Sequence, residues 1–517
     1  MLSLTPRDYQ KAIFETAKDN NTLVVLPTGI GKTLISLLLT VERLKKFPMK
    51  KVLMLAPTRP LVEQHMESFS KQLPELFADI QIFTGSVEAK NRKKIFETAE
   101  IIFSTPQCIA NDLRKGLYSM TDVCLLVIDE AHRCLKNYDY TAVVDYYKRQ
   151  AQHQRILGLT ASPGYDIDKV KEICNNLGIE EIEVRTRDSE DVKPYLQERE
   201  FTKVEVPFPQ EFVEIKTLLN RIYNSKIDQL RSRSLLFGNA NKITLLMLQK
   251  KLALRVGGRD FNAMIGMSLA AQAIKISHAI ELLETQTLSG LNEYMRGLIK
   301  QASEKKSKGV QTLVKQGEFN AAMISLQGLL TKKIEHPKIE ELGVIVDEQL
   351  KKDKGSKIMV FCQFRETAAT IVRRLEEIDG IRASVFIGQA KRIGAKGTSG
   401  LNQREQKSII EKFRTGEINI LVATSIGEEG LDIPEVSAVV FYEPIPSAIR
   451  KIQRAGRTAR LSPGKLIIMM TNDTRDISSH YASTAREKKM YKTIETVKKE
   501  LKEINEKKDR TLKEFYG

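Results

Sequence analysis

Short apolar runs separated by amphipathic stretches fill the first 200 residues of the chain. The runs at 23–26, 52–55, 101–103, 125–128 and 156–159 have the length and apolar character of strands that are buried on both faces. Helical patterns occupy the intervals between them. This alternation predicts repeated βα units, and therefore a parallel sheet covered by helices on both faces.

The same alternation returns after about residue 340, with candidate strands at 357–361, 383–386, 420–423 and 438–441. From about 205 to 335 strand-like alternation is nearly absent. There, apolar residues such as Ile215, Leu219 and Ile222 fall on one helical face. We predict an α/β fold class in which two parallel-sheet domains, 1–204 and 336–482, are separated by an all-helical insert at 205–335.

The tail at 483–517 is rich in Lys and Glu and carries an apolar seam. The seam repeats at 4-3-4-3 spacing and consists of Met490, Ile494, Val497, Leu501 and Ile504. We predict a charged C-terminal helix that docks on the chain's own domains. A coiled coil is less favoured, because the pattern fails at Lys508.

The composition is that of a soluble globular protein with excess positive charge. Hydrophobic residues make up 42% and charged residues 28% of the 517 residues, which excludes disorder throughout and a collagen-like fibre. Lys and Arg number 82 against 65 Asp and Glu, for a net charge of +17. That sign suits a polyanionic partner such as nucleic acid, although a chain can also simply be soluble and basic. The sequence has no run of 18 apolar residues and no signal-peptide pattern, so we expect no membrane span.

The cysteines indicate neither a disulfide framework nor a zinc site. Their number is odd and their spacing wide, and they are Cys108, Cys124, Cys134, Cys174 and Cys362. We expect reduced thiols in the core of a cytoplasmic, nucleoid-associated protein.

The first part of the insert is strongly basic. Across 221–255 Asp228 is the single acidic residue, against Arg221, Lys226, Arg231, Arg233, Lys242, Lys250, Lys251 and Arg255. The stretch is either a solvated helix face or a nucleic-acid contact. Because the whole chain is basic, we favour contact with nucleic acid, with Arg231, Arg233, Lys250 and Lys251 as the candidate residues.

The strongest local signal is a strand that runs into a glycine-containing loop and then into an apolar helix at 23–39. The glycines let backbone N–H groups turn toward phosphate oxygens, and the helix N-terminus adds the positive end of its dipole. Lys32 can neutralise the β- and γ-phosphates of a nucleotide, and Thr33 can ligate Mg²⁺. Leu26 stands where the general pattern has Gly. The predicted phosphate-binding residues are Pro27, Thr28, Gly29, Gly31, Lys32 and Thr33.

The partner motif, Asp129-Glu130-Ala131-His132, directly follows the strand at 125–128. A carboxylate at the C-terminal end of a parallel strand lies beside the phosphate loop in such sheets. We predict that Asp129 holds the metal through water. Glu130 then orients and deprotonates the attacking water, which is the base role that phosphoryl transfer to water requires.

These two motifs, with others in order along 4–460, resemble superfamily 2 helicases of the DEAH type. Arg7 and Gln10 stand in a segment similar to the family's adenine-reading element. The segment at 423–434 is similar to motif V and 453–460 to motif VI. The resemblance implies two RecA-like domains, binding of ATP and Mg²⁺, and further nucleotide-site residues at Gly430, Asp432, Gln453, Arg457 and Arg460.

Motif VI has a physical reason to lie on the second α/β domain. Arginines supplied from a neighbouring domain neutralise charge on the transferring phosphoryl group, an effect of roughly 10³–10⁵ in rate. Gln453, Arg457 and Arg460 are the candidates. The ATP site is then complete only when the two domains close on each other.

The remaining motifs resemble the strand-gripping and coupling loops of the same family. Segment 56–64 is similar to motif Ia, 160–162 to motif III, and 360–365 to motif IV. Motif III, with Thr160, Ala161 and Ser162, would couple the ATP site to the nucleic-acid site. The implied nucleic-acid contacts are Thr58, Arg59, Thr84, Gly85, Thr105, Pro106, Gln363 and Thr424.

The position of the insert narrows the range of helicase families that the chain resembles. Nearly 200 residues separate Ser162 from Val360. An insert there is shared by RIG-I-like receptors, Dicer helicases and the FANCM/Hef DNA translocases. Segments 185–195, 386–389 and 400–406 are similar to the last family, and most of all to its archaeal Hef members. Hef-type proteins carry a C-terminal nuclease with a Glu-Arg-Lys core, and that tripeptide is not found here. We therefore expect a helicase fragment and carry over no nuclease function.

Three functions remain open from the sequence. The first is an ATP-dependent DNA helicase or translocase acting on branched DNA in replication-fork repair, where the branched preference comes from the resemblance alone. The second is an ATPase activated by double-stranded RNA, as in the RIG-I-like group. The third is a non-catalytic nucleic-acid clamp, against which the intact ATP motifs argue.

The histidines outside the Asp-Glu-Ala-His motif, among them His65, His278 and His336, form no metal-spaced cluster and are expected to be structural.

Overall fold

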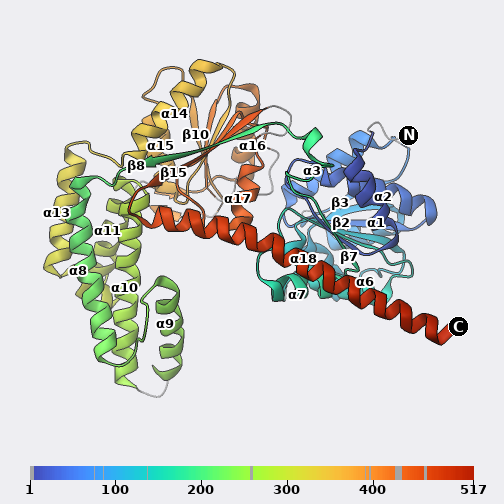
Figure 1. Cartoon of the computed structure of the whole chain (residues 1–517), viewed down its shortest axis with the longest axis horizontal. Coiled ribbons are helices and arrows are strands. Elements are labelled where there is room, and N and C mark those ends of the chain that lie inside the picture. Colours follow the sequence, from blue (N-terminus) through green and yellow to red (C-terminus); the bar gives the residue numbers. More distant parts are fainter. Residues whose placement is uncertain are drawn as a thin grey trace.

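The computed structural model describes residues 5–74, 76–85, 87–136, 138–256, 260–389, 392–394, 397–424, 433–458 and 463–516. Two parallel-sheet domains lie side by side, and a bundle of helices projects from the second (Figure 1). A long C-terminal helix runs from the second domain across the first. The predicted α/β class, with two sheets and a helical insert, is confirmed.

The first domain is built on a sheet of order β3-β4-β2-β5-β6-β1-β7 in which the strand pairings are parallel. Helices α1 to α3 pack on one face and α4 to α7 on the other, which is why the central strands are apolar at every position. The strands are β1 Thr22–Val25, β2 Lys51–Leu55, β3 Ile80–Phe83, β4 Ile101–Ser104, β5 Val123–Ile128, β6 Ile156–Thr160 and β7 Glu181–Val184. The helices are α1 Asp8–Asp19, α2 Lys32–Lys46, α3 Arg59–Gln72, α4 Ala89–Thr98, α5 Pro106–Arg114, α6 Asp139–Gln150 and α7 Ile167–Leu177, with short 3₁₀ turns at Ala131–Arg133 and Lys193–Tyr195.

The second domain has a parallel sheet of order β10-β13-β9-β14-β15-β8. Helices α14 and α15 cover one face, and α16 and α17 the other. The strands are β8 Arg199–Val206, β9 Ile358–Phe361, β10 Ala383–Phe386, β13 Ile420–Ala423, β14 Ala438–Phe441 and β15 Gly464–Thr471, and an antiparallel pair joins β11 Arg392–Gly394 to β12 Gly397–Ser399. The helices are α14 Lys338–Lys352, α15 Arg365–Leu375, α16 Gln403–Thr415 and α17 Ala448–Ala455.

The helical insert has two small cores. The helices are α8 Gln210–Ser232, α9 Lys242–Val256, α10 Phe261–Thr285, α11 Leu288–Ser303, α12 Lys308–Val314 and α13 Gly317–Thr331. One core joins α8, α10, α11, α12 and α13 near the second domain, and the other joins α8, α9 and α10 at the far end. By length and composition α10 could cross a membrane, but more than half of its apolar window is buried here as the central helix of the bundle.

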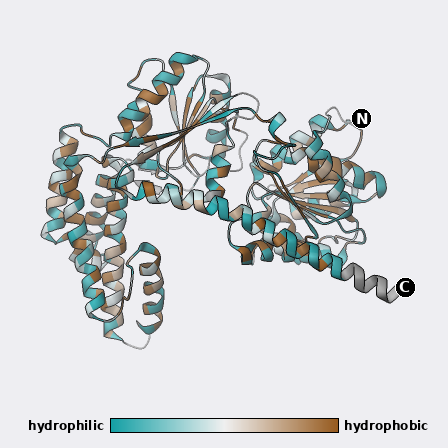
Figure 2. Cartoon of the chain, in the orientation of Figure 1, coloured by the Kyte–Doolittle hydropathy of each residue, from teal (hydrophilic) through white to brown (hydrophobic). Residues whose placement is uncertain are grey.

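The C-terminal helix α18, Arg475–Tyr516, connects the two domains physically (Figure 1). It leaves the second domain after β15 and packs on α7 of the first. Met490, Ile494 and Val497 are buried there in the first domain's core, and Leu501 is partly buried beside them. The prediction that the seam docks on the chain's own domains is confirmed. Figure 2 shows the corresponding pattern, with hydrophobic strands in both sheets and helices that are mixed in hydropathy.

Two expected domain boundaries fall inside single elements. Strand β8, Arg199–Val206, pairs along its whole length with β15 of the second sheet, so the boundary expected at residue 204 divides this strand. Helix α18 is continuous from Arg475, so the boundary expected at 482 divides that helix. The segment that leads from the first domain to the insert is thus a strand of the second sheet, and the C-terminal helix begins within the range expected for the second domain.

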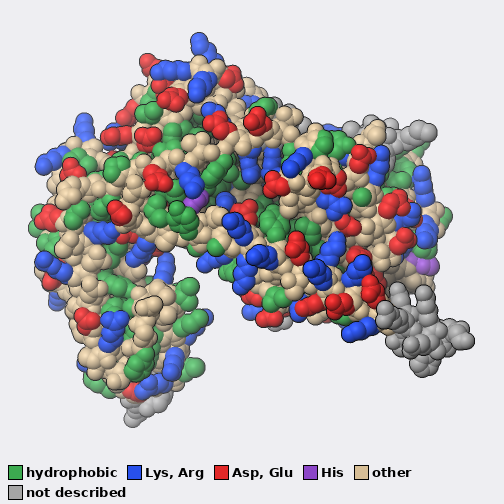
Figure 3. Space-filling view, in the orientation of Figure 1, with side chains coloured by type: hydrophobic (Ala, Val, Ile, Leu, Met, Phe, Trp, Pro, Cys, Tyr) green, Lys and Arg blue, Asp and Glu red, His purple; other side chains and the backbone are tan. Residues whose placement is uncertain are grey.

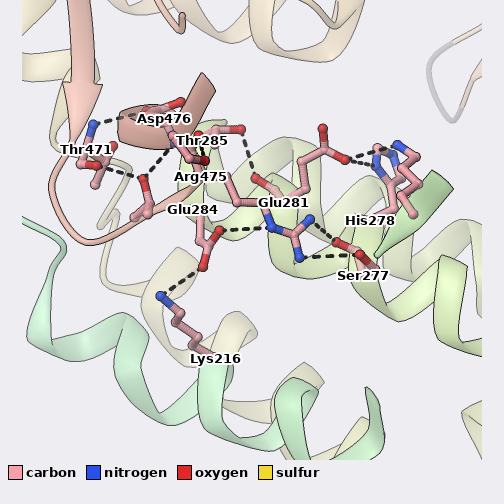
Figure 4. Close-up of polar contacts among 12 residues, drawn as sticks. Lys216, Ser277, His278, Glu281, Glu284, Thr285, Thr471, Arg475 and Asp476 are labelled. Carbon is pink, nitrogen blue, oxygen red and sulfur yellow. Dashed lines mark hydrogen bonds and ion pairs between the residues drawn. The ribbon is translucent and has the colours of Figure 1, made fainter. Parts of the chain in front are cut away.

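Polar contacts hold the insert on the second domain where α18 begins (Figure 4). Arg475 pairs with Glu284 of α10 at 3.4 Å between Nε and Oε2, and its Nη1 donates to the carbonyl of Ser277 at 2.9 Å. Glu284 also pairs with Lys216 of α8 at 2.8 Å. Because α8 and α10 are tied to α18 in this way, we expect the insert to move with the second domain.

A buried ion pair lies behind these contacts. Lys338 is fully buried and pairs with Asp476. The Oδ2 of Asp476 also accepts the backbone N–H of Thr471 at 3.0 Å (Figure 4). His336 is also fully buried, and its Nε2 lies 3.3 Å from the carbonyl oxygen of Glu284. His336 thus has the structural role expected from the sequence.

Candidate nucleotide site and nucleic-acid interface

The predicted ATP motifs meet at one edge of the first sheet. The phosphate loop follows β1, the Asp-Glu-Ala-His segment follows β5, and the segment 160–162 follows β6. In the sheet the order is β5-β6-β1, and all three strands are parallel. Their carboxyl ends therefore lie side by side, which is where α/β sheets bind ligands.

The loop between β1 and α2 has the backbone that phosphate binding requires. Gly29 and Gly31 both have φ of 85°, in the left-handed region, and Gly31 caps α2. Lys32 and Thr33 are the first two residues of α2, at the positive end of its dipole. The ammonium of Lys32 donates to the carbonyl of Leu26 at 3.3 Å, so its side chain folds over the loop.

The segment predicted to contact adenine packs directly on this loop. Gln10 Nε2 lies 3.4 Å from the carbonyl oxygens of both Ile30 and Gly31, and Tyr9 donates to Ile30 at 2.6 Å. Arg7 caps α1, where its backbone N–H donates to Gln10 Oε1 at 2.9 Å. Gln10 and Tyr9 therefore contact the backbone of the phosphate loop directly.

The two acidic residues after β5 differ in environment. Asp129 is 5% exposed, and its Oδ2 lies 2.8 Å from Nε2 of His65 on α3. Burial acts to raise the pKa of Asp129, but His65 and Lys32 outweigh that effect and hold the pKa below its ordinary value. Asp129 is therefore held ionised, as a metal-binding carboxylate must be.

His65 is a residue of this site that the sequence interpretation treated as structural. It lies on α3, seven residues after Thr58, and two turns of helix bring it to Asp129, which follows β5. Nothing in its spacing marks it, because its partner Asp129 is 64 residues away in sequence. The one available signal was its place in the helix that follows motif Ia.

Glu130 adopts an unusual backbone conformation. Its φ and ψ are 50° and 47°, a left-handed conformation that costs energy in a non-glycine residue. Its Oε2 lies 3.2 Å from Nδ1 of His132, and the same nitrogen is 3.2 Å from Oγ1 of Thr160. The carboxylate after β5 is thereby linked to the loop after β6.

The link continues beyond the first domain. Ser162 donates its N–H to Thr160 Oγ1 at 3.1 Å, and its hydroxyl lies 2.7 Å from Sδ of Met490 on α18. The neighbouring Ala161 is 4% exposed. The three predicted coupling residues, Thr160, Ala161 and Ser162, thus lie between the acidic pair and a helix that begins in the second domain.

Motif VI faces the phosphate loop across the domain boundary. Gln453 lies on α17 and Arg457 just after it, and both are at most 9% exposed. Between them Gly456 lies against Thr28, because a Cβ atom added to Gly456 would stand 1.4 Å from Thr28 Oγ1. Arg460, Gly430 and Asp432 lie outside the described residues.

The predicted nucleic-acid loops of the first domain lie at the other half of the same sheet edge. Thr58 and Arg59 follow β2, Thr84 and Gly85 follow β3, and Thr105 and Pro106 follow β4. These strands are neighbours in the order β3-β4-β2, so their loops are adjacent. In the second domain the exposed Gln363 follows β9 and Thr424 follows β13, which are also neighbours.

One ion-pair chain bridges the two domains at this edge. Glu63 on α3 accepts Arg59 Nε at 2.8 Å and Lys407 Nζ of α16 at 2.9 Å. Arg59 is thus held by Glu63 in this arrangement, and contact with a phosphate would compete with that pair.

The four predicted contacts of the insert lie at its far end, with Arg231 in the last turn of α8, Arg233 just after α8, and Lys250 and Lys251 on α9. Arg231 is 3.8 Å from Asp228 within α8, and Arg233 donates to Asn262 at 3.2 Å. Lys250 and Lys251 lie on α9, and both are exposed. They make no ion pair with any described residue. The structure brings these four residues to one end of the bundle but not to the sheet edges.

The oxygen donors of the site suit Mg²⁺ bound together with nucleotide phosphates. Thr33 supplies a hydroxyl and Asp129 an ionised carboxylate, and hard cations take oxygen ligands. Among the described residues no cluster of three His, Cys, Asp or Glu side chains could hold a metal alone. A Mg²⁺ ion here would thus need further oxygen ligands from the nucleotide or from water.

Three family profiles match the chain in succession. They are "DEAD/DEAH box helicase" at residues 7–170, "Putative ATP-dependent RNA helicase, helical bundle" at 211–332, and "Helicase conserved C-terminal domain" at 338–462. They coincide with the first sheet domain, the helical insert and the second sheet domain.

Full-length relatives are similar over nearly the whole chain. "Putative ATP-dependent RNA helicase MJ1505" of Methanocaldococcus jannaschii is 37% identical, over 96% of this chain and 61% of that protein. "Fanconi anemia group M protein homolog" of Mus musculus is 33% identical, over 94% and 26%. "ATP-dependent DNA helicase fml1" of Schizosaccharomyces pombe is 32% identical, over 96% and 60%. The chain therefore spans less than two thirds of the length of these relatives.

A solved structure is similar over almost its entire length. The crystal structure of the Pyrococcus furiosus Hef helicase domain is 43% identical and superposes with a TM-score of 0.70. The match covers 92% of this chain and 98% of that one.

Proposed function

The chain belongs to the FANCM/Hef family of superfamily 2 DEAH-type helicases, and from this premise we propose that it is an ATP-hydrolysing DNA helicase or translocase that acts on branched DNA. Its place would be in the repair of stalled replication forks, in the cytoplasm at the nucleoid.

The contact between Thr28 and Gly456 is the observation that carries the ATPase part of this proposal. It places a residue of the phosphate loop against motif VI, which belongs to a different domain. In this closed arrangement Arg457 comes from the second domain to a site whose phosphate-binding elements come from the first. Because arginine supplied across a boundary accelerates phosphoryl transfer, hydrolysis depends on domain closure.

The roles of the individual residues follow from their positions. Lys32 and the N-terminus of α2 would bind the β- and γ-phosphates, and Glu130 would orient and deprotonate the attacking water. Gln453, Arg457 and Arg460 would stabilise the charge that develops on the transferring phosphoryl group. Thr33 and Asp129 would hold Mg²⁺, and a bound Mg²⁺ ion would neutralise charge on the phosphates. Arg7 and Gln10 would contact the adenine side of the nucleotide.

Branched DNA as the substrate is supported by the relatives and by the insert. One curated relative is named a DNA helicase and another belongs to the Fanconi anemia group M proteins. The insert carries exposed cations at the end farthest from the second domain, where they could meet a second arm of a junction (Figure 1). RNA is the alternative, because two of the matching descriptions name an RNA helicase.

A substrate panel tests the proposal. ATPase and unwinding rates would be compared on a fork, a Holliday junction, a linear DNA duplex and an RNA duplex, with Lys32→Ala as the control that lacks phosphate binding. We expect hydrolysis stimulated most by branched DNA, and none in the Lys32→Ala variant. Stimulation by the RNA duplex alone would replace DNA with RNA as the substrate, and equal turnover in the Lys32→Ala variant would remove the ATP site from this loop.

A further inference from the structure

Helix α9 of the insert is apolar on two opposite faces. Leu245, Leu248 and Leu252 are buried and pack with α10 in the small core at the far end of the insert. On the other face Ile243 is 63%, Met247 64% and Leu254 86% exposed. A helix on the surface of a protein ordinarily presents polar side chains on its solvent-facing side.

These exposed residues form one continuous stripe. Ile243, Met247 and Leu254 lie 4 and 7 residues apart, the spacing that repeats on one side of an α-helix. We call these three residues the α9 stripe. Leu246, which is 44% exposed, borders it on one side. Three large apolar side chains aligned in solvent indicate a surface that is covered when the protein works.

Positive charge surrounds the α9 stripe. The helix contains Lys242, Lys250, Lys251 and Arg255 and no Asp or Glu. Lys250 lies within the stripe, between Met247 and Leu254, and Lys251 is beside it. In the part of the chain that the structure describes, neither of these two lysines makes an ion pair, whereas Lys242 pairs with Glu281 and Arg255 with Asp260.

The stripe belongs to a helix that borders an open hollow. Helix α9 lies on the side of α10 that faces the first domain (Figure 1), and the space-filling view shows a hollow between that end of the insert and the first domain (Figure 3). Exposed aromatic side chains lie at the same end of the insert, with Phe237 79% and Phe261 71% exposed.

We propose that the α9 stripe packs against exposed base faces at the branch point of a DNA junction, while Lys250 and Lys251 bind the flanking phosphates. This inference rests on the proposed function and names the part of the insert that would recognise the branch. Ile, Leu and Met are among the side chains that proteins insert between base steps, where they partly unstack the bases.

The charge pattern favours DNA over a protein as the partner of the α9 stripe. A surface that is apolar along its centre and cationic within and beside that centre matches an exposed base face flanked by backbone phosphates. A purely apolar protein partner would leave Lys250 buried without a counter-charge, which is costly. A fully stacked linear duplex offers no free base face in its interior, so such a contact favours branch points.

The test compares three variants of the full chain. The stripe variant carries Ile243→Gln, Met247→Gln and Leu254→Gln, because Gln retains helix propensity and length but not apolar surface. The matched control is Ile324→Gln on α13, where Ile324 is 73% exposed. The charge variant carries Lys250→Ala and Lys251→Ala. Fork binding is measured by anisotropy over a range of salt, with 2-aminopurine at the branch point as a reporter of base stacking.

The stripe variant is expected to bind the fork about tenfold more weakly, which corresponds to the loss of roughly one base contact. Its salt dependence should equal that of the wild type, since no charge is removed, and its 2-aminopurine signal at the branch point should revert to that of free fork. The charge variant should instead flatten the salt dependence. ATPase without DNA should be unchanged in the stripe variant, and Ile324→Gln should match wild type in both fork binding and ATPase.

Two results would overturn the proposal. If wild type binds forks and hydrolyses ATP while the stripe variant matches it in affinity and 2-aminopurine signal, the stripe does not contact bases. If wild type self-associates and the stripe variant is monomeric, with equal fork affinity, the stripe is an interface between copies of the chain. Failure of wild type itself to bind DNA or hydrolyse ATP would instead refute the proposed function.

Discussion

The hydroxyl of Ser162 lies 2.7 Å from Sδ of Met490, although 328 residues separate them in sequence. Ser162 belongs to the loop after β6 of the first domain, and Met490 lies on α18, which begins in the second. The contact therefore brings a helix anchored in one domain to the segment that borders the ATP site of the other. Closing or opening of the domains must either carry α18 along or break this contact.

Ser162→Ala should uncouple hydrolysis from unwinding. The substitution removes one hydrogen bond, worth about 1 kcal/mol, and leaves Lys32, Asp129 and Glu130 in place. ATP hydrolysis should be largely retained while the number of base pairs unwound per ATP falls. Paired phosphate-release and strand-displacement assays measure both. Equal loss of both rates would mean that Ser162 acts in the chemistry and not in coupling.

Met490→Ala tests the same contact from the side of α18. Met490 is fully buried in the first domain's core, so truncation should lower the free energy of unfolding by about 2–5 kcal/mol. Met490→Leu keeps the volume and should cost less than about 1.5 kcal/mol. Denaturant unfolding of both variants distinguishes them, and an unfolding midpoint unchanged in Met490→Ala would show that α18 is not held on the first domain in solution.

The sequence predicted the strands β1, β2, β4, β5, β6, β9, β10, β13 and β14 because their signals are local, but it did not predict β3, β7, β8 or β15. Apolar runs buried on both faces are short and unmistakable, and the phosphate loop is contiguous. Strand β8 has no such run, because it is the outer strand of its sheet and alternates exposed and partly buried residues. Its partner β15 lies over 250 residues later, so only tertiary pairing identifies it. The contact of His65 with Asp129 also joins residues that are distant in sequence, so the sequence alone could not predict it.

Glu130→Gln should bind Mg-ATP and hydrolyse it slowly. The proposed metal ligands Asp129 and Thr33 remain in place, but the attacking water loses its base. That loss should lower kcat by about 10²–10⁴. Nucleotide affinity from equilibrium titration and kcat from phosphate release separate binding from chemistry. A collapse of affinity with kcat unchanged would make Glu130 a metal ligand.

Gly456→Ala should prevent the domains from closing. Gly456 has φ of −75°, which alanine adopts freely, so the only new feature is a Cβ atom that would stand 1.4 Å from Thr28 Oγ1 and 2.7 Å from Thr28 Cβ. If closure brings the arginines of motif VI to the phosphate, kcat should fall by an amount approaching the roughly 10³–10⁵ that such arginines contribute. Gly297→Ala is the control, because nothing lies within 4 Å of its added Cβ. Wild-type kcat in Gly456→Ala would show that hydrolysis does not use this closed arrangement.

Stability should decline in acid because of His336. Burial lowers the pKa of His336 to about 3, and the nearby Lys338 acts in the same direction. In the unfolded chain His has its ordinary pKa of about 6.5, so between these values the unfolded state binds the extra proton and stability rises with pH. Relative to His336→Asn, wild type should lose about 1.4 kcal/mol per pH unit below 6.5. Denaturant unfolding at several pH values measures the difference, and parallel pH profiles for the two proteins would refute a buried neutral His336.

The basic end of the insert should determine preference among DNA structures. Sheet-edge loops that contact a strand backbone have no evident means of distinguishing a fork from a single strand. Arg231 and Arg233 instead lie at the C-terminal end of α8 and Lys250 and Lys251 on α9, away from those edges. Removing all four charges should therefore weaken fork binding much more than single-strand binding. The slope of log affinity against log salt should decrease by about 0.9 for each phosphate that the protein no longer neutralises. ATPase without DNA should be unchanged, since the nucleotide motifs lie outside the insert. Uniform weakening on every substrate would make these residues a general electrostatic patch, and no change on any substrate would make them a solvated helix surface.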